Sequence, residues 1–409
     1  MARGAALSEM KILIVVGARP NFMKTAPLIR AIQERNASGK SPHVRHLLVH
    51  TGQHYGELMS DRFFEDLQLP KPDIHLGVGS ATHGVQTAAI LRAFEETLTR
   101  EWPDVVVVVG DVNSTVACAL ATAKLPARPD RPRPLIAHVE AGLRSFDREM
   151  PEEINRIVTD HLADLLFVTE KSGLANLRKE GVPAKKVFFV GNTMIDSLLA
   201  SQGQADKSQV LEELGLRAKS TSNGNHDTVR PYALLTLHRP SNVDQADAFE
   251  SVLKGLSDHA RKFPIVFPVH PRTRKKIGEL GLEKYFHRDA SKNGRGIILT
   301  DPLGYLDFLC LMKNASLVLT DSGGIQEETT CLGVPCVTIR ENTERPVTVK
   351  GGTNTLAGTT AGGIRQAIAR QASGKRRGRI PEKWDGKAAQ RIVPILIAEV
   401  QKSAARAKS

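Results

Sequence analysis

Aromatic residues, cysteines and long apolar runs are all scarce in this sequence. Phe, Trp and Tyr make up only 5% of the 409 residues, so the chain offers few of the aromatic platforms on which nucleic-acid bases stack. The four cysteines (118, 310, 331 and 336) show no CxxC spacing, which argues against a zinc site and a disulfide framework. No apolar run approaches the ~20 residues of a membrane span, and the N-terminal MARGAALSEMK lacks the apolar core of a signal peptide. We therefore expect a cytoplasmic protein without a membrane partner.

Acidic residues are also in short supply. The 56 Lys and Arg residues outnumber the 44 Asp and Glu residues, which leaves a net charge of +12. Part of the excess lies in GKRRGR (374–379) and in the C-terminal AARAKS, which are typical of a solvated surface or a frayed tail. Many other basic residues stand beside carboxylates at predicted strand ends, whereas a nucleic-acid-binding protein would gather them on one exposed face. The charge thus favours an acidic small-molecule substrate over nucleic acid.

Two series of short apolar segments predict two parallel β-sheets. The segments are continuously apolar rather than alternating, and stretches of helical length separate them, which is typical of strands buried on both faces. The first series covers residues 11–16, 46–50, 105–109, 135–139, 165–169 and 187–190, and the second covers 233–236, 265–269, 297–300, 317–320 and 336–339. A chain of 409 residues also exceeds what one hydrophobic core usually organises. We predict an α/β protein with two doubly wound, Rossmann-like domains, 9–195 and 196–385.

Polar residues follow two of the first predicted strands. GARPNFMK places Arg19 and Lys24 on the first strand-to-helix loop, where backbone N–H groups and the positive end of a helix favour phosphate. Two exposed basic residues at a helix start are an equally good interpretation. GDVNST places Asp111 at the mouth of a buried strand, where its carboxylate could act on a sugar or hold an active-site arginine. Taken alone, Asp111 is more typical of a helix N-cap.

The motifs HVEAGLR and MPEEINR bring three carboxylates and two arginines into one short stretch: Glu140, Glu152, Glu153, Arg144 and Arg156. Glu140 follows the end of a predicted strand, and ligands of α/β proteins bind at the carboxyl ends of strands. We therefore expect Glu140 to act in an active site. Glu153 is better explained as an acidic residue that interacts with the dipole at a helix start.

The second series carries two histidine-containing loops. TLHRPSN opens its first strand-to-helix loop with His238, which we place toward the cleft expected between the two domains. PVHPRTR repeats the arrangement with His270, although part of its charge is explained by solvation. A lone histidine is more often structural than catalytic, so neither residue defines a site by itself.

TDSGGIQEE is the clearest candidate for a phosphate-binding loop. Gly323 and Gly324 would let the backbone approach a ligand, Ser322 offers a hydroxyl, and Glu328 stands where it could reach a ribose. DSGG also surrounds serine-protease nucleophiles, but a parallel sheet and a helix directly after the glycines argue against that chemistry.

No cofactor or metal site is indicated. GVGSATHG has Thr82 where a dinucleotide fingerprint needs its third glycine, and no strong strand precedes it. His50 and His54 are spaced like a metal-binding pair, yet the glycines around them favour a loop and a third ligand is not evident. We expect a reaction without a redox cofactor and without a bound metal.

Together these motifs resemble the non-hydrolysing UDP-N-acetylglucosamine 2-epimerase family. The resemblance runs from about residue 11 to residue 358, and the blocks occur in the family's order: GARPNFMKTAP, HTGQHY, GDVNST, HVEAGLR, MPEEINR, GNTMID, LHRPSN, PVHP, TDSGGIQEE and ENTERP. It implies a GT-B-like fold of two Rossmann-like domains facing across a cleft. It also implies a C-terminal helix, at about residues 386–402, that crosses back onto the first domain, and a homodimer.

The resemblance further implies residue roles. The residues that match the family's catalytic groups are Asp111, Glu140, Glu152 and His238. Those that match its substrate contacts are Arg19, Lys24, Arg156, His270, Ser322, Gly323, Gly324, Glu328 and Arg345. One position departs from the family pattern, because Ser241 stands where a glutamate is frequent.

The activity implied by the resemblance is epimerisation of UDP-N-acetylglucosamine to UDP-N-acetylmannosamine, by elimination of UDP and its re-addition to a glycal. GARPNFMK and HPRTR also resemble relatives that act on UDP-2,3-diacetamido-2,3-dideoxyglucuronate. A GT-B glycosyltransferase and a hydrolysing epimerase are further alternatives. A transferase would need an acceptor and would leave the C2 proton in place.

Overall fold

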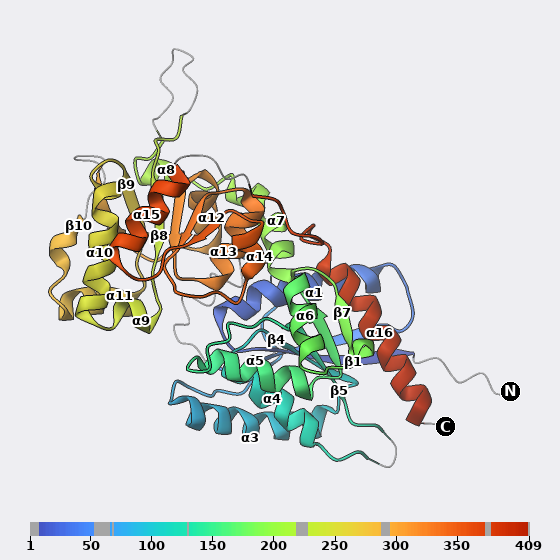
Figure 1. Ribbon diagram of the computed structural model, residues 1–409. Coiled ribbons are helices and arrows are strands. Elements are labelled where there is room, and N and C mark those ends of the chain that lie inside the picture. The colour runs from blue at the N-terminus through green and yellow to red at the C-terminus, as the bar shows by residue number, and fades with distance from the viewer. Residues whose placement is uncertain are drawn as a thin grey trace. The chain divides into compact units, whose positions relative to one another are not determined.

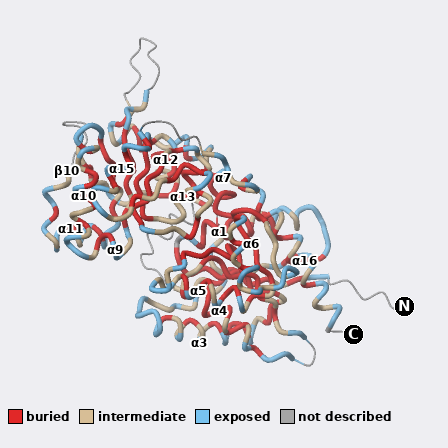
Figure 2. The backbone as a smooth tube through the Cα atoms, in the orientation of Figure 1, coloured by how far each residue is buried: buried red, intermediate tan, exposed pale blue. Residues whose placement is uncertain are grey.

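The computed structural model describes residues 8–52, 66–67, 69–128, 131–217, 228–287, 295–372 and 378–407. It divides into two compact units, of which the first comprises Met1–Leu199 and Glu382–Ser409 and the second comprises Ala200–Pro381. Each unit contains one seven-stranded sheet (Figure 1). Neighbouring strands in both sheets are parallel, which confirms the predicted α/β fold. Figure 2 shows that buried backbone concentrates in the interior of each unit.

The first sheet has the order β3-β2-β1-β4-β5-β6-β7. Its strands are β1 (Glu9–Val16), β2 (His43–His50), β3 (Ile74–His75), β4 (Val105–Val109), β5 (Leu135–Ala141), β6 (Leu165–Val168) and β7 (Val187–Phe189). β4 consists of five valines, all buried, because helices cover both faces of the sheet. The strand order reverses between β1 and β4, and ligands of open α/β sheets bind beyond the carboxyl ends of strands at such a reversal.

Helices cover both faces of the first sheet. The helices of this unit are α1 (Arg19–Ala37), α3 (His83–Glu101), α4 (Asn113–Lys124), α5 (Pro151–Leu162), α6 (Lys171–Lys179) and α16 (Ala388–Ala407), with a 3-10 turn η1 (Ala184–Lys186). α7 (Thr193–Ala205) begins in the first unit and ends in the second. α3, α4 and α5 lie side by side over one face, and α1 and α16 pack together on the other (Figure 1).

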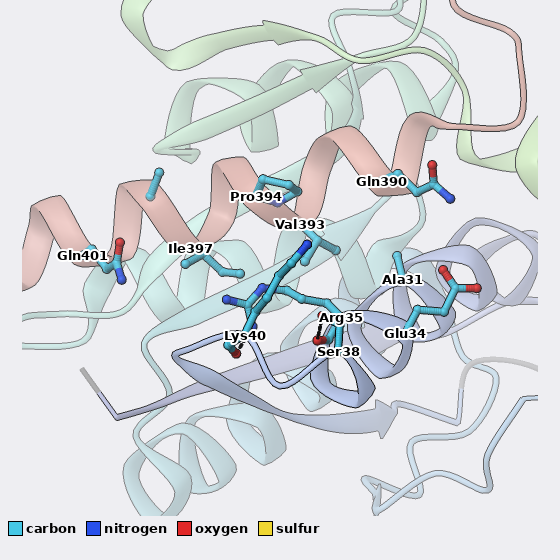
Figure 3. A pocket seen from close by; sticks show the side chains of 11 residues that line it. Ala31, Glu34, Arg35, Ser38, Lys40, Gln390, Val393, Pro394, Ile397 and Gln401 are labelled. Carbon is cyan, nitrogen blue, oxygen red and sulfur yellow. Dashed lines mark hydrogen bonds between the residues drawn. The ribbon is translucent and has the colours of Figure 1, made fainter. Parts of the chain in front are cut away.

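The C-terminal helix α16 is fixed to the first unit at its beginning. Its first residues, Ala388 and Ala389, donate backbone N–H groups at 3.1 and 2.8 Å to the carboxylate of Asp196 in α7. Asp196 therefore caps the N-terminus of α16 from another helix. Farther along, α16 and α1 enclose a groove of about 540 Å³, toward which Val393 and Ile397 extend from α16 (Figure 3).

The second sheet has the order β10-β11-β9-β8-β12-β13-β14. Its strands are β8 (Ala233–Thr236), β9 (Pro264–Pro268), β10 (Phe286–His287), β11 (Gly296–Thr300), β12 (Leu317–Thr320), β13 (Cys336–Thr338) and β14 (Asn354–Leu356). The order reverses between β8 and β12, so this sheet also has a ligand-binding edge of the Rossmann type.

The remaining helical elements belong to the second unit. They are α8 (Val210–Glu213), α9 (Pro240–Val243), α10 (Ala246–Ala260), α11 (Pro271–Glu279), η2 (Glu283–Tyr285), α12 (Tyr305–Asn314), α13 (Gly323–Leu332), α14 (Pro346–Lys350) and α15 (Ala361–Ala372). α10 packs against α15, and the apolar side chains of α10 join those of the strands in one buried core. Within the described part of the chain, no helix combines the length and the apolar character needed to cross a membrane.

Three short strands were not predicted, and several strand ends differ from the sequence prediction; β2, for example, begins at His43 rather than at residue 46. β3, β10 and β14 are only two or three residues long, too short to show an apolar pattern. β5 continues through Glu140 to Ala141, whereas the prediction ended it at residue 139. The register with β6 shifts between Val139 and Ala141, so Glu140 occupies an irregularity inside the strand. Most of the polar stretch 220–228 lies outside the described residues.

Candidate active site

Glu140 and Lys24 form a buried ion pair at the carboxyl edge of the first sheet. The Lys24 ammonium, from α1, lies 2.7 Å from each carboxylate oxygen of Glu140, and the two side chains are only 4% and 3% exposed. Glu140 has a backbone φ of 76°, a left-handed conformation that costs a non-glycine residue about 1–3 kcal/mol. The bulge and the ion pair together aim this carboxylate, so a strained residue lies where the sequence predicts a catalytic one.

Gly110 brings the next carboxylate, Asp111, close to this pair. Gly110 has a φ of 69°, and a Cβ atom there would lie 3.0 Å from the Lys24 ammonium nitrogen and 3.9 Å from a Glu140 oxygen. Both the conformation and the limited space call for glycine. The loop after β4 therefore passes directly beside the ion pair, and Asp111 follows it.

Asp111 is paired with Arg156 of α5. The guanidinium Nε and Nη2 donate to the same Asp111 oxygen, Oδ2, at 3.0 and 2.7 Å. Asn155 donates its side-chain N–H to the Asp111 carbonyl at 2.9 Å, which fixes the backbone as well. Arg156 is buried, and Asp111 keeps 22% of its side chain exposed. The arrangement holds the Asp111 carboxylate beside a buried cation at the mouth of β4.

The two adjacent glutamates of α5 have different surroundings. Glu152 is half-buried in the first turn and has no side-chain partner among the described residues. Glu153 is buried and accepts hydrogen bonds from the Ser145 backbone and hydroxyl at 2.9 and 3.0 Å, from the Phe146 N–H at 2.9 Å, and from Arg156. The helix-dipole interpretation of Glu153 does not account for these bonds.

His138 and Asp160 hold the same loop through the Gly110 carbonyl, and no sequence motif indicated this contact. His138 lies in β5, with Nδ1 2.6 Å from an Asp160 oxygen and Nε2 2.8 Å from the Gly110 carbonyl. The other Asp160 oxygen accepts from the Gly142 N–H and lies 2.7 Å from Arg144. Burial acts to raise the pKa of Asp160, but the His138 and Arg144 charges outweigh it and hold that pKa below its ordinary value.

In the second unit, His238 is paired with a buried aspartate, Asp321. Their Nδ1 and Oδ1 atoms lie 2.9 Å apart, and the His238 side chain is 55% exposed while Asp321 is fully buried. Asp321 also accepts the backbone N–H groups of His238 and Arg239. Partial burial lowers the pKa of His238, but the Asp321 carboxylate raises it more, so the net direction is upward. Asp321 was not among the predicted site residues, although it directly precedes Ser322.

The predicted phosphate-binding loop forms the beginning of α13. Ser322 is the N-cap residue, and Gly323 and Gly324 begin the helix. A Cβ atom on Gly323 would lie 2.5 Å from the Arg345 guanidinium, so the glycine lets that cation lie against the helix start. Arg345 is buried, 2.8 Å from Glu327 and in contact with Glu344. A helix start beside an arginine is suited to an anionic ligand.

Glu328 is a buried carboxylate farther along α13. Burial raises its pKa to about 8, the hydrogen bond from Tyr305 opposes this, and the neighbouring Glu327 raises it further. Tyr305 donates its hydroxyl to Glu328 at 3.3 Å. A carboxyl group with this pKa keeps a proton near neutral pH.

His270 and Arg19 complete the predicted set. His270 is the N-cap of α11, and its Nδ1 accepts the Arg272 N–H at 3.2 Å. The side chain of Arg19 lies outside the described part of the structure. The fold thus joins Lys24 with Glu140 and Asp111 with Arg156 in one unit, and it places His238, through Asp321, next to Ser322 in the other. Among the described residues, no group of three or more His, Cys, Asp or Glu side chains could hold a metal ion.

The architecture and these polar edges define a two-domain, GT-B-like α/β enzyme. A solved structure of the Methanocaldococcus jannaschii UDP-GlcNAc 2-epimerase, in complex with UDP-GlcNAc and UDP, matches with a TM-score of 0.82 and 41% identity, over 95% of this chain and 100% of that one. The sequence model of UDP-N-acetylglucosamine 2-epimerase matches residues 36–397. The chain belongs to the UDP-N-acetylglucosamine 2-epimerase family.

Two curated relatives that are named for different substrates are similar to this chain. The UDP-N-acetylglucosamine 2-epimerase of Methanocaldococcus jannaschii is 42% identical over 95% of this chain and 99% of its own length. The UDP-2,3-diacetamido-2,3-dideoxy-D-glucuronate 2-epimerase of Pseudomonas aeruginosa is 40% identical over 85% of this chain and 88% of its own length. Both relatives are named for inversion at C2 of a UDP-linked acetamido sugar.

Proposed function

We propose that this protein interconverts UDP-N-acetylglucosamine and UDP-N-acetylmannosamine by inverting C2. One observation carries the proposal: Asp111 and Glu140, each paired with a cation, lie at one sheet edge in a chain 42% identical to an enzyme of that name. The substrate is an acidic nucleotide sugar, and the net charge of +12 favours its approach.

The chemistry requires the C1–O bond to weaken before C2 loses its proton. A C2–H next to an amide nitrogen is too weak an acid for direct removal by a carboxylate. As the bond to UDP breaks, C1 becomes oxocarbenium-like and acidifies C2–H. Loss of that proton and of UDP leaves a glycal with a C1–C2 double bond. Return of a proton to the opposite face of C2 and of UDP to C1 gives the epimer, with atoms and electrons conserved.

Residues of the second unit stabilise the departing diphosphate. The beginning of α13, from Ser322 to Gly324, presents backbone N–H groups at the positive end of a helix. Arg345 adds a cation beside Gly323. His238, whose pKa is raised by Asp321, supplies positive charge or a proton to the leaving oxygen. Glu328 contacts the ribose, and His270 is a further substrate contact. Arg19, which belongs to the first unit, is another.

Carboxylates of the first unit transfer the protons. Two faces of C2 need two acid/base groups, and Asp111, Glu140 and Glu152 are the candidates. Lys24 contacts Glu140 and Arg156 contacts Asp111, so a cation stands beside each of these two carboxylates. Glu152 has no competing partner among the described residues, which suits a group that shuttles a proton.

The proposal also covers the cofactor requirement, the cellular location, the oligomeric state and the role of each domain. The reaction needs no redox cofactor, because no electrons leave the sugar. We place the enzyme in the cytoplasm, as a homodimer, with the substrate-binding domain at residues 196–385 and the catalytic carboxylates in the domain at 9–195.

The proposal is tested by incubating the desalted protein with UDP-N-acetylglucosamine, without acceptor, and separating the products by ion-pair chromatography. A UDP-N-acetylmannosamine peak that approaches a constant ratio supports the proposal. Release of free N-acetylmannosamine and UDP would identify a hydrolysing epimerase, and no reaction without an acceptor would favour a transferase.

A second candidate substrate is UDP-2,3-diacetamido-2,3-dideoxyglucuronate, favoured by the 40% identity to the Pseudomonas aeruginosa enzyme. The same assay with this sugar decides between the two. A kcat/KM at least 100-fold higher for one substrate assigns the specificity, since a site built for a substrate carboxylate rejects the analogue that lacks it.

A further inference from the structure

Arg156 is shared between two carboxylates, only one of which was expected to act in the reaction. Its Nε and Nη2 donate to Asp111 at 3.0 and 2.7 Å, and its Nη1 donates to Glu153. Arg156 and Glu153 are both almost completely buried, whereas Asp111 is partly exposed. The buried Arg156 guanidinium therefore connects the partly exposed Asp111 carboxylate with the buried Glu153 carboxylate.

The buried Glu153 carboxylate accepts hydrogen bonds at both of its oxygens. One Glu153 oxygen accepts from the Ser145 N–H and hydroxyl and from Arg156, and the other accepts from the Phe146 N–H. Phe146 has a φ of 62° and is 72% exposed, so its bond to Glu153 holds a left-handed backbone position at the surface. Glu153 cannot reach a substrate from this position, and its effect must pass through Arg156.

The shared cation has an electrostatic consequence for Asp111. An arginine within contact distance of one carboxylate lowers that group's proton affinity strongly. Here a second negative charge, on Glu153, offsets part of the Arg156 charge. Asp111 is therefore oriented by the guanidinium while remaining a stronger base than it would be beside Arg156 alone.

We propose that Glu153 is a positioning residue for the reaction: through Arg156 it orients the Asp111 carboxylate and keeps it basic enough to take the C2 proton. This inference rests on the proposed function. It differs from the helix-dipole role, which would affect folding stability and leave the pH dependence of catalysis unchanged.

Other charged groups around the Asp111 loop would stay constant in a test of Glu153. Among the described residues they include Lys24 on α1, Glu140 and His138 on β5, Asp160 on α5 with its partner Arg144, and His83 on α3, which reaches the loop through Asn113. Glu153→Gln removes one charge and preserves the shape. We expect kcat to fall roughly 100-fold with KM within about threefold, because a misaligned catalytic group costs about that much.

The pH profile separates positioning from a structural role. With Glu153 neutral, the full Arg156 charge acts on Asp111, so the acid limb of the kcat profile should move to lower pH by about 1. Glu149→Gln, an exposed position in the loop that precedes α5, is the matched control and should keep the wild-type profile. Circular dichroism and thermal melting establish that each variant is folded.

If Glu153→Gln does not fold, Glu153→Asp provides the decision, since the shorter side chain keeps the negative charge but cannot hold Arg156 and the Ser145 and Phe146 N–H groups in the same geometry. A fall in its kcat at nearly constant KM, with the acid limb of the pH profile unchanged, supports the proposal, and a wild-type kcat overturns it. A folded Glu153→Gln with wild-type kcat and pH profile overturns the proposal alone. Absence of turnover in the wild-type protein would overturn the proposed function and this inference with it.

Discussion

Glu140 combines two unfavourable features, a left-handed backbone and a buried charge. The φ of 76° costs about 1–3 kcal/mol, and burial of a carboxylate is tolerated only because Lys24 contacts both of its oxygens. A fold retains such costs where they serve a reaction. At the scale of single residues, this is the strongest structural reason to regard Glu140 as catalytic.

Replacing Glu140 by Gln should abolish most of the activity while leaving the fold intact. The amide keeps the shape but cannot accept a proton, so we expect kcat to fall between about 10² and 10⁴-fold. Leaving Lys24 buried without its counter-ion should also lower the melting temperature. The measurement is steady-state turnover with a thermal melt of the same sample. Near-normal turnover in both Glu140→Gln and Asp111→Asn would contradict the assigned roles.

Glu328 should make the stability of the protein depend on pH. Its pKa is raised by burial from 4.5 to about 8, so the folded state holds a proton that the unfolded chain releases. The stabilisation from this proton is complete below pH 4.5 and is lost as the pH rises toward 8, by up to ~1.4 kcal/mol per pH unit.

The test of Glu328 is urea unfolding between pH 5 and pH 9 for the wild type and for Glu328→Gln. The amide cannot ionise, so the variant should become more stable relative to the wild type as the pH increases. Glu283→Gln changes an exposed glutamate of the same unit and should follow the wild type. A difference between wild type and Glu328→Gln that does not vary with pH would show that Glu328 does not carry this proton.

At the scale of elements, α16 depends on a cap supplied by another helix. Asp196 of α7 accepts the first two N–H groups of α16, although 192 residues separate Asp196 from Ala388. Asp196→Ala should therefore lower the free energy of unfolding by about 1–2 kcal/mol. Glu399→Ala, which removes a surface ion pair with Lys402 on the same helix, should cost less than about 0.5 kcal/mol. Equal effects in denaturant unfolding would mean that Asp196 is not the cap.

The sequence predicts those helices and strands whose apolar pattern lies within their own residues. β4 consists of five buried valines, and its composition alone predicts a strand. β8 and β12 are also apolar, and the sequence predicted both with the observed bounds. β14 carries no such signal in its three residues, of which only Leu356 is apolar, and it pairs with β13 at the edge of the sheet. The bulge that extends β5 depends on its neighbour β6, so it too is absent from local sequence.

The candidate site shows the same division between local and distant information. Short motifs indicated Glu140 and Ser322, because each stands at the end of an apolar run. The supporting contacts join residues far apart, such as His138 with Asp160, 22 positions away, and Lys24 with Glu140, 116 positions away. Such partners have no spacing that a single sequence reveals, and only the fold brings them together.

At the scale of the whole molecule, the two units share one type of sheet topology. Each unit has a seven-stranded parallel sheet whose order reverses at one point, and each places its polar residues at the carboxyl ends of the strands beside that reversal. The first unit offers carboxylates with paired cations, and the second offers a helix start with arginine and histidine. This division matches the two demands of the proposed reaction, proton transfer and stabilisation of a departing diphosphate.

In the proposed mechanism, C2 exchanges its hydrogen with solvent during epimerisation. A proton NMR time course in D2O tests this exchange directly. The sample is the purified, desalted protein with UDP-N-acetylglucosamine, without acceptor or added cofactor. We expect the C2 proton signal to disappear as the UDP-manno epimer forms with deuterium at C2. An epimer that keeps its C2 proton, or a sugar that remains unchanged with both candidate substrates, would contradict it.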